Sequence, residues 1–217
     1  MDNRNYKTER IRNINSKFDF FIKVEVVGDS KVGKTALLKQ LINNEFDEEY
    51  IPTYGYEFNI YIIKINEIII KFQIWDMSGA DNYRISLLHL YRNATLGILV
   101  YSVCSRESFN NLENWIIQLK DKAPTSKTIL LGNKCDEKEK REVSYEEGKE
   151  IFEKYNLEYF MEISAKYNFN KLNFMEIGAI SIYKEYIMNG SDISNRNLNE
   201  SIMLNNPVKS NRNKCCK

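Results

Sequence analysis

The chain has 217 residues, which is enough for one domain with a full hydrophobic core and additional terminal segments. Its 31 lysines and arginines almost balance its 30 aspartates and glutamates, so no broad basic surface indicates nucleic acid, and we expect no nucleic-acid partner. No apolar run is long enough to cross a bilayer, and the four cysteines do not form a disulfide framework, so we expect a cytosolic chain.

Short runs of β-branched residues alternate with longer amphipathic segments from residue 18 onward. This alternation is typical of an α/β fold with a mostly parallel sheet. The predicted strands cover residues 20–27, 57–65, 68–75, 95–103, 128–134 and 159–164, and the predicted helices cover residues 33–44, 108–120, 144–155 and 170–188.

Two features refine this assignment. Only Asn66 and Glu67 separate the second and third strands, which predicts an antiparallel hairpin at one edge of the sheet. Ser144 and Glu147 have the spacing of a capping box at the start of a helix. Residues 1–17 and 189–217 are polar with little periodicity, so we expect a flexible N-terminal extension, one domain at 18–188 and a flexible C-terminal tail.

The segment "GDSKVGKT" between the first strand and the first helix has the spacing of a phosphate-binding loop. Its backbone N–H groups suit a β-phosphate, the Lys34 ammonium suits the β- and γ-phosphates, and the Thr35 hydroxyl suits Mg²⁺. The predicted nucleotide-binding residues of this loop are Gly28, Asp29, Ser30, Lys31, Val32, Gly33, Lys34 and Thr35.

A second motif selects the base. The segment "NKCD" follows the apolar run "TILLG" and therefore lies at the carboxyl end of a strand, where open α/β sheets bind ligands. The Asp136 carboxylate can accept two hydrogen bonds from guanine, and adenine offers no such pair of donors. The segment "SAK" ends the next strand and can brace the same base. The predicted base-binding residues are Asn133, Lys134, Asp136, Ser164, Ala165 and Lys166.

With these motifs in this order, residues 20–188 resemble a small GTPase of the Ras superfamily, and more narrowly the Rab family. The Rab-like segments are "YIPTYGYEF", "KFQIWD", "LYRNA" and "VYSVCSRESF". The resemblance implies a three-layer P-loop GTPase fold, in which a six-stranded, mostly parallel sheet carries helices on both faces. It also implies a monomer that binds GTP or GDP with Mg²⁺ and regulates vesicle trafficking.

The resemblance assigns further roles. Thr53 joins Thr35 as a Mg²⁺ ligand, Asp76 holds the ion through water, and Phe46 packs against guanine. Gly79 gives its backbone N–H to the γ-phosphate, so that the segments near Thr53 and Gly79 become ordered with GTP and relax after hydrolysis.

Ala80 occupies the position at which the family carries the glutamine that orients the attacking water. We therefore count Ala80 with Lys34 and Gly79 as the catalytic positions, and expect weak GTP hydrolysis without a partner. Asp81 and His89 are the neighbouring candidates for a replacement, and a partner protein can also supply the missing groups.

Two other departures from the family pattern concern neighbouring surfaces. Lys31 stands at a small-residue position, where its ammonium either approaches the phosphates or points to water. Leu90 replaces the third member of an aromatic effector-binding set, which leaves Phe58 and Trp75.

Cys215 and Cys216 near the C-terminus resemble the Rab ending that carries two geranylgeranyl groups, which would attach the protein to the cytosolic face of an endomembrane. The implied partners are an exchange factor, a GTPase-activating protein, effectors on the two switches, a prenylation escort and a GDP-dissociation inhibitor. The alternative is a GTP-loaded membrane adaptor with negligible hydrolysis.

Overall fold

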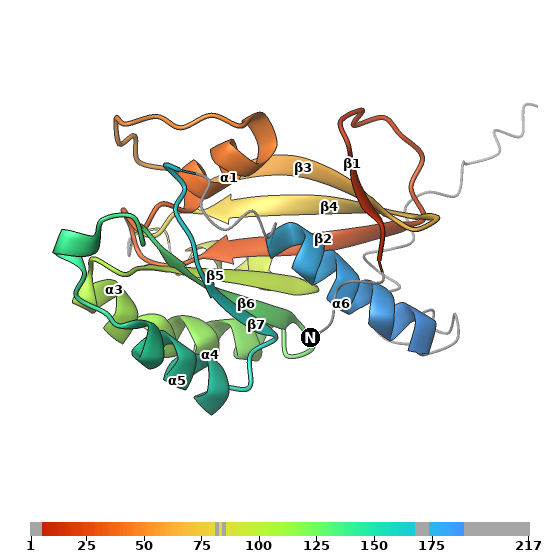
Figure 1. Ribbon diagram of the computed structural model, residues 1–217. Coiled ribbons are helices and arrows are strands. Elements are labelled where there is room, and N and C mark those ends of the chain that lie inside the picture. The colour runs from red at the N-terminus through yellow and green to blue at the C-terminus, as the bar shows by residue number, and fades with distance from the viewer. Residues whose placement is uncertain (1–5, 81–82, 84–85, 168–173, 189–217) are drawn as a thin grey trace, which may run out of the picture.

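The computed structural model describes residues 6–80, 83, 86–167 and 174–188. These residues form one mixed sheet with helices on both faces (Figure 1). Within the described ranges the sheet has seven strands in the order β1-β3-β4-β2-β5-β6-β7. The strands are β1 (Thr8–Ile11), β2 (Phe20–Val27), β3 (Tyr56–Ile65), β4 (Ile68–Met77), β5 (Leu96–Ser102), β6 (Lys127–Asn133) and β7 (Tyr159–Glu162).

Five neighbouring strands run parallel, namely β4, β2, β5, β6 and β7. Strand β3 pairs antiparallel with β4. The predicted hairpin is therefore confirmed, and Asn66 in its two-residue turn has a positive φ of 53°. The central parallel strands β5 and β6 are almost entirely buried, because helices cover both of their faces.

The helices divide the core into two layers. One apolar cluster lies between the sheet and helices α1 (Lys34–Asn43) and α6 (Phe174–Met188). The other lies between the opposite face of the sheet and α4 (Leu112–Lys122), with contributions from α5 (Tyr145–Lys154). Short helices at α3 (Arg106–Asn110), η1 (Leu88–Tyr91) and η2 (Lys138–Lys140) complete the described structure.

The boundaries of three predicted helices can be compared with the structure. The predicted capping box is confirmed, because Ser144 Oγ accepts from the Glu147 backbone and the Glu147 carboxylate accepts from the Ser144 backbone. The helix predicted at 108–120 is instead two helices, α3 and α4, that meet at Asn111. The last helix is described from Phe174, since residues 168–173 lie outside the described ranges.

The seventh strand departs from the predicted six. β1 lies in the segment that was expected to be a flexible extension, and it pairs antiparallel with residues 62–65 of β3. Arg10 fixes it further, because its guanidinium donates to the carbonyl oxygens of Leu41 at 2.9 Å and Ile42 at 2.6 Å in the last turn of α1. The same guanidinium lies 4.9 Å from the ring centroid of Tyr61.

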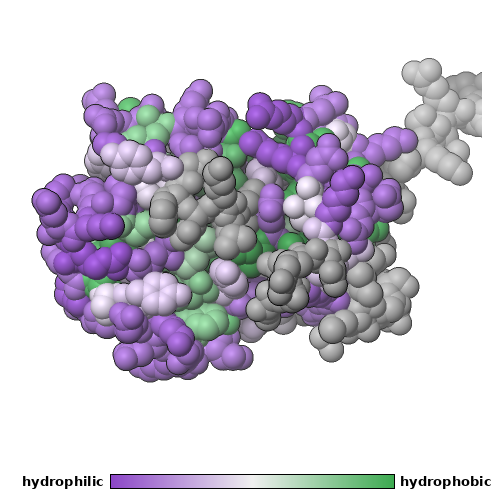
Figure 2. Space-filling view, in the orientation of Figure 1, coloured by the Kyte–Doolittle hydropathy of each residue, from purple (hydrophilic) through white to green (hydrophobic). Residues whose placement is uncertain are grey.

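The face of the molecule shown in Figure 2 is mostly hydrophilic, with hydrophobic side chains in small patches between polar ones. In the part of the chain that the structure describes, no helix has the length and hydropathy needed to span a membrane. The predicted tail at 189–217, including Cys215 and Cys216, lies outside the described residues.

Candidate functional site

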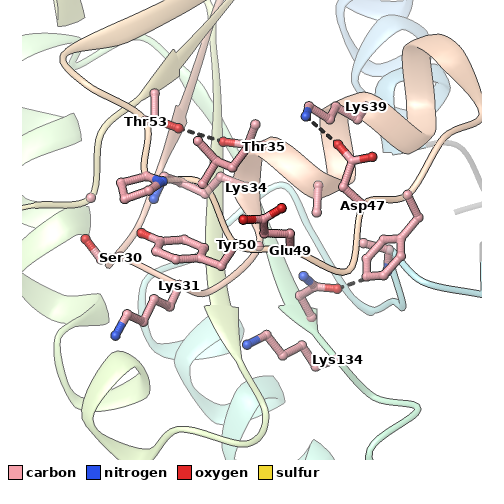
Figure 3. Close-up of a pocket in the computed structure, with 18 of the residues that line it drawn as sticks. Ser30, Lys31, Lys34, Thr35, Lys39, Asp47, Glu49, Tyr50, Thr53 and Lys134 are labelled. Atoms are coloured by element: carbon pink, nitrogen blue, oxygen red, sulfur yellow. Dashed lines mark hydrogen bonds and ion pairs between the residues drawn. The ribbon is translucent and has the colours of Figure 1, made fainter.

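A cavity of about 570 Å³ opens at the carboxyl ends of the parallel strands, where open α/β sheets bind ligands (Figure 3). Six parts of the chain line it, namely the loop between β2 and α1, the N-terminal part of α1, the segment between α1 and β3, the segment after β4, and the loops after β6 and β7. These segments are far apart in the sequence, and the fold brings the predicted phosphate and base motifs to one place. The lining residues from the prediction are Ser30, Lys31, Gly33, Lys34, Thr35, Phe46, Thr53, Gly79, Ala80, Asn133, Lys134, Asp136, Ala165 and Lys166.

The glycines of the phosphate-binding loop are required by close contacts. A Cβ atom at Gly28 would lie 2.1 Å from the Val100 carbonyl oxygen, and one at Gly33 would lie 2.3 Å from Asn133 Nδ2. Gly33 also has a φ of 97°, which side chains disfavour. The loop can therefore lie directly on β5 and on the base motif only because these positions lack side chains.

Lys34 is buried at the floor of the cavity. Its ammonium donates to the backbone carbonyl oxygens of Gly28 at 2.9 Å and Asp29 at 2.8 Å. Burial lowers the pKa of Lys34 to about 8, and the nearby carboxylate of Asp76 partly opposes this effect. A buried ammonium in this position favours an anionic ligand, because such a ligand would stabilise its charged form.

Three oxygen-bearing side chains meet beside Lys34. Thr35 Oγ1 lies 2.8 Å from Thr53 Oγ1 and donates to Asp76 Oδ2 at 2.5 Å (Figure 3 shows the two threonines). The other oxygen of Asp76, Oδ1, is buried and has no hydrogen-bond partner. Burial raises the pKa of Asp76 to about 6. Hard oxygen donors with one unsatisfied carboxylate oxygen suit Mg²⁺, so these residues fit the ion that the sequence analysis expects.

The opposite end of the cavity holds the base motif. Asn133 links three motifs, since its Nδ2 donates to the Val32 carbonyl oxygen at 2.8 Å and its Oδ1 accepts from the Ala165 backbone at 3.2 Å. Lys166 forms an ion pair with Glu48 at 2.9 Å, which connects the "SAK" loop to the segment between α1 and β3. Asp136 and Phe46 line the same end. We call this the base end, and the part beside Lys34 the phosphate end.

Some predicted residues lie behind the cavity wall instead of lining it. The Asp29 carboxylate points toward α4, where it accepts from Asn111 Nδ2 and Trp115 Nε1, both at 2.7 Å. Ser164 is buried, and its hydroxyl accepts from the Tyr167 backbone at 3.1 Å. The set that does not line the cavity comprises Gly28, Asp29, Val32, Asp76 and Ser164.

The segment after β4 reaches the phosphate end. A Cβ atom at Gly79 would lie 2.3 Å from the Asp29 backbone, so this glycine packs directly on the phosphate-binding loop. Ala80 lines the cavity with only a methyl group, and its N–H donates to Ser78 Oγ at 3.4 Å. His89 is exposed, contacts the Ser86 carbonyl oxygen at 2.8 Å and does not line the cavity. Asp81 lies outside the described residues.

Three tyrosines that were not predicted as site residues also line the cavity, namely Tyr50, Tyr54 and Tyr83. Tyr50 stands three residues before Thr53, so its proximity to a predicted Mg²⁺ ligand was the available indication. Tyr54 directly follows Thr53, and Tyr83 stands three residues after Ala80, so proximity to a predicted site residue was the indication for these two as well.

Another aromatic residue that was not predicted, Tyr56, lies on the adjoining surface. Trp75 contacts Phe58 at 5.2 Å between ring centroids, and it also contacts Tyr56 at 5.0 Å. Tyr56 and Phe58 are two residues apart on β3 and so share a face of the strand. A third aromatic side chain thus joins Phe58 and Trp75, although Leu90 is not aromatic.

Comparison with known proteins agrees with this arrangement. The sequence model of the Ras family matches residues 23–182. The chain is 38% identical over 196 residues to Ras-related protein Rab-11B of Dictyostelium discoideum, and the match covers 87% of each chain. It is also 38% identical over 154 residues to Ras-related protein Rab-8A of Gallus gallus, covering 70% of this chain and 74% of the relative. Ras-related protein Rab-3C of Bos taurus is 38% identical over 154 residues, covering 70% and 67%.

Proposed function

The chain belongs to the Ras family of small GTPases and is Rab-like, and from this premise we propose that it is a GTP/GDP switch in vesicle trafficking with slow intrinsic hydrolysis. The observation that carries the proposal is the single cavity lined by Lys34, Thr35 and Thr53 at one end and by Asp136 at the other. A cavity with one end suited to phosphates and the other end suited to a base fits a nucleotide.

The base end supports selectivity for guanine. Asp136 lines the cavity and can accept from both the N1–H and the exocyclic amino group of guanine. Asn133 holds the loop that carries Asp136 to both the phosphate-binding loop and Ala165. A site built on such hydrogen bonds can discriminate against a ligand that lacks the donors by a factor of ~10⁴.

The phosphate end supports a two-state switch. Lys34 supplies positive charge, and Thr35, Thr53 and Asp76 would hold Mg²⁺, which when bound neutralises phosphate charge. Thr53 belongs to the segment between α1 and β3, and Gly79 belongs to the segment after β4. Contacts from these two residues therefore connect the state of the nucleotide to two surface segments that a partner can recognise.

Ala80 is the reason for proposing slow hydrolysis. Its methyl group has no donor or acceptor with which to orient an attacking water, and His89 does not line the cavity. Phosphoryl transfer depends on positioning and electrostatic stabilisation, and loss of one such group costs on the order of 10²–10³ in rate. A partner that supplies a glutamine and an arginine would restore the rate.

The alternative is a GTP-loaded membrane adaptor that hardly hydrolyses its nucleotide, and the same methyl group of Ala80 favours it. Under both alternatives we propose membrane attachment through geranylgeranyl groups on Cys215 and Cys216, on the cytosolic face of an endomembrane. Both also include the family's exchange factor, escort, GDP-dissociation inhibitor and effectors.

A single-turnover assay tests the proposal. Purified protein is loaded with GTP and Mg²⁺, and phosphate release is followed for the wild type, Ala80→Gln and Ala80→Leu. We expect Ala80→Gln to be faster by on the order of 10²–10³, and Ala80→Leu to stay slow because it adds bulk without a donor. Equal rates for the wild type and Ala80→Gln would show that another group orients the water. A wild type that retains GTP indefinitely would favour the adaptor.

A further inference from the structure

Lys31 has a backbone conformation that its side chain does not favour. Its φ is 65°, in the left-handed region that residues other than glycine and asparagine seldom adopt. Such a conformation persists only where the surrounding structure fixes it. The two glycines on either side of Lys31 provide this constraint, because Gly28 packs on β5 and Gly33 packs on Asn133. The loop therefore fixes the direction in which the Cα–Cβ bond of Lys31 leaves the backbone.

That direction leads to Tyr50. The ammonium of Lys31 lies 5.9 Å from the centroid of the Tyr50 ring, and both residues line the phosphate end of the cavity. Figure 3 shows Lys31 beside Tyr50, on the opposite side of the ring from Thr53 and Thr35. A cation over an aromatic face at this distance is attractive. The contact joins the phosphate-binding loop to the segment between α1 and β3.

The same segment has three further connections to the rest of the domain. Asp47 pairs with Lys39 on α1 at 2.6 Å, and Glu48 pairs with Lys166 at 2.9 Å. Thr53 Oγ1 lies 2.8 Å from Thr35 Oγ1. The two ion pairs are near the base end of this segment, whereas Tyr50 and Thr53 cover the phosphate end. The Lys31 ammonium thus contacts a Tyr50 ring that is otherwise largely exposed to solvent.

We propose that Lys31 and Tyr50 form a clasp across the phosphate end of the cavity that slows release of the bound nucleotide. This inference rests on the proposed function, since it requires a guanine nucleotide in the cavity. A nucleotide leaving from this end must separate the Tyr50 ring from the Lys31 ammonium. The strength of an exposed cation–π contact corresponds to an increase of about twofold to fivefold in the release rate when the contact is lost.

The test measures dissociation of a fluorescent GDP analogue from the full chain in the presence of Mg²⁺ and excess GTP. Lys31→Met keeps the unbranched side chain and removes the charge, and Tyr50→Leu removes the ring. We expect each variant to release the analogue about twofold to fivefold faster than the wild type. The double variant should release it no faster than the faster single variant, because both changes remove one contact. Tyr50→Phe keeps the ring face and should recover most of the slow release.

Lys120→Met is the matched control. Lys120 on α4 lies 5.4 Å from the Tyr155 ring centroid, so this variant removes a similar contact away from the cavity, and release should stay at the wild-type rate. Acceleration by Lys31→Met without acceleration by Tyr50→Leu would overturn the clasp and assign Lys31 to the phosphates directly. Wild-type release from Lys31→Met overturns the clasp but leaves the proposed function intact. A wild type that binds no guanine nucleotide overturns both.

Discussion

Trp115 on α4 donates its indole N–H to Asp29 in the phosphate-binding loop, with 2.7 Å between Nε1 and Oδ1. The other oxygen of Asp29 accepts from Asn111 at the junction of α3 and α4. The loop is therefore anchored from behind by a helix that does not line the cavity.

Trp115→Phe tests this anchor. The variant keeps most of the buried ring but removes the donor, so Asp29 retains only the Asn111 bond. We expect the free energy of unfolding to fall by about 1–3 kcal/mol, because a partly buried acceptor loses one of its two hydrogen-bond partners. We also expect weaker binding of GDP, since the loop is less constrained. Chemical denaturation and a GDP titration measure the two effects. Ile117→Ala, at an exposed position of the same helix, should leave GDP affinity unchanged.

Asp136→Asn tests the base end. An asparagine side chain has an NH2 donor group in place of one of the two acceptor oxygens, so its two terminal atoms cannot accept both hydrogen bonds from guanine. We expect weaker GTP binding and a relative gain for xanthosine triphosphate, whose base carries an oxygen where guanine has an amino group. Competition titrations with the two nucleotides measure the ratio of affinities. Glu139→Gln, on the nearby turn η2, is the control. Unchanged selectivity in Asp136→Asn would disprove the assignment of Asp136.

Glu25 predicts a pH-dependent stability. It is fully buried in β2, with the Lys23 ammonium 3.3 Å from one carboxylate oxygen. Burial raises the pKa of Glu25 to about 8, although Lys23 opposes this effect. The folded state thus favours the protonated form more than the unfolded state does. The stability that this preference contributes is full below the unfolded pKa and is lost as the pH rises through about 8.

Glu25→Gln should remove this pH dependence. Each pKa unit corresponds to about 1.4 kcal/mol, so the variant should gain free energy of unfolding relative to the wild type between pH 5 and pH 8. Denaturation curves at several pH values measure the slope, and Glu150→Gln on α5 is the exposed control. Identical slopes for the wild type and Glu25→Gln would show that Lys23 fully compensates the buried charge.

Arg10→Gln tests the connection between β1 and α1. The variant loses the charged donors to the Leu41 and Ile42 carbonyl oxygens. We expect a loss of about 1–2 kcal/mol in the free energy of unfolding, and faster hydrogen exchange at the Asn44 amide, which closes the last turn of α1 on Gln40. Arg12→Gln, at an exposed position just after β1, should change neither quantity.

Much of the fold followed from local patterns in the sequence. The buried parallel strands are continuous apolar runs, and the phosphate loop and capping box are short motifs with fixed spacing, so they could be predicted. β1 could not, because "TERI" is short and polar and becomes a strand only by pairing with residues some fifty positions away. The split of the helix occurs at Asn111, whose side chain makes a tertiary contact, the hydrogen bond to Asp29.

The candidate site shows the same division. The motif residues that line the cavity were predicted from spacing, whereas side-chain directions were not. Asp29 belongs to the phosphate-binding loop but faces α4, and Tyr56 lies in a Rab-like segment without a predicted role but contacts Trp75. Neither relationship is local in the sequence, since each depends on how β3, β4 and α4 are placed.

β1 has a consequence for the behaviour of the protein at high concentration. It covers residues 62–65 of β3, where three of the four side chains are isoleucine. An uncovered outer strand of this composition offers free backbone donors and acceptors to the same strand of another molecule, which is a common route to aggregation. Because β1, a charged segment of the same chain, pairs with this isoleucine-rich stretch, the backbone of β3 is not available there for pairing with another molecule.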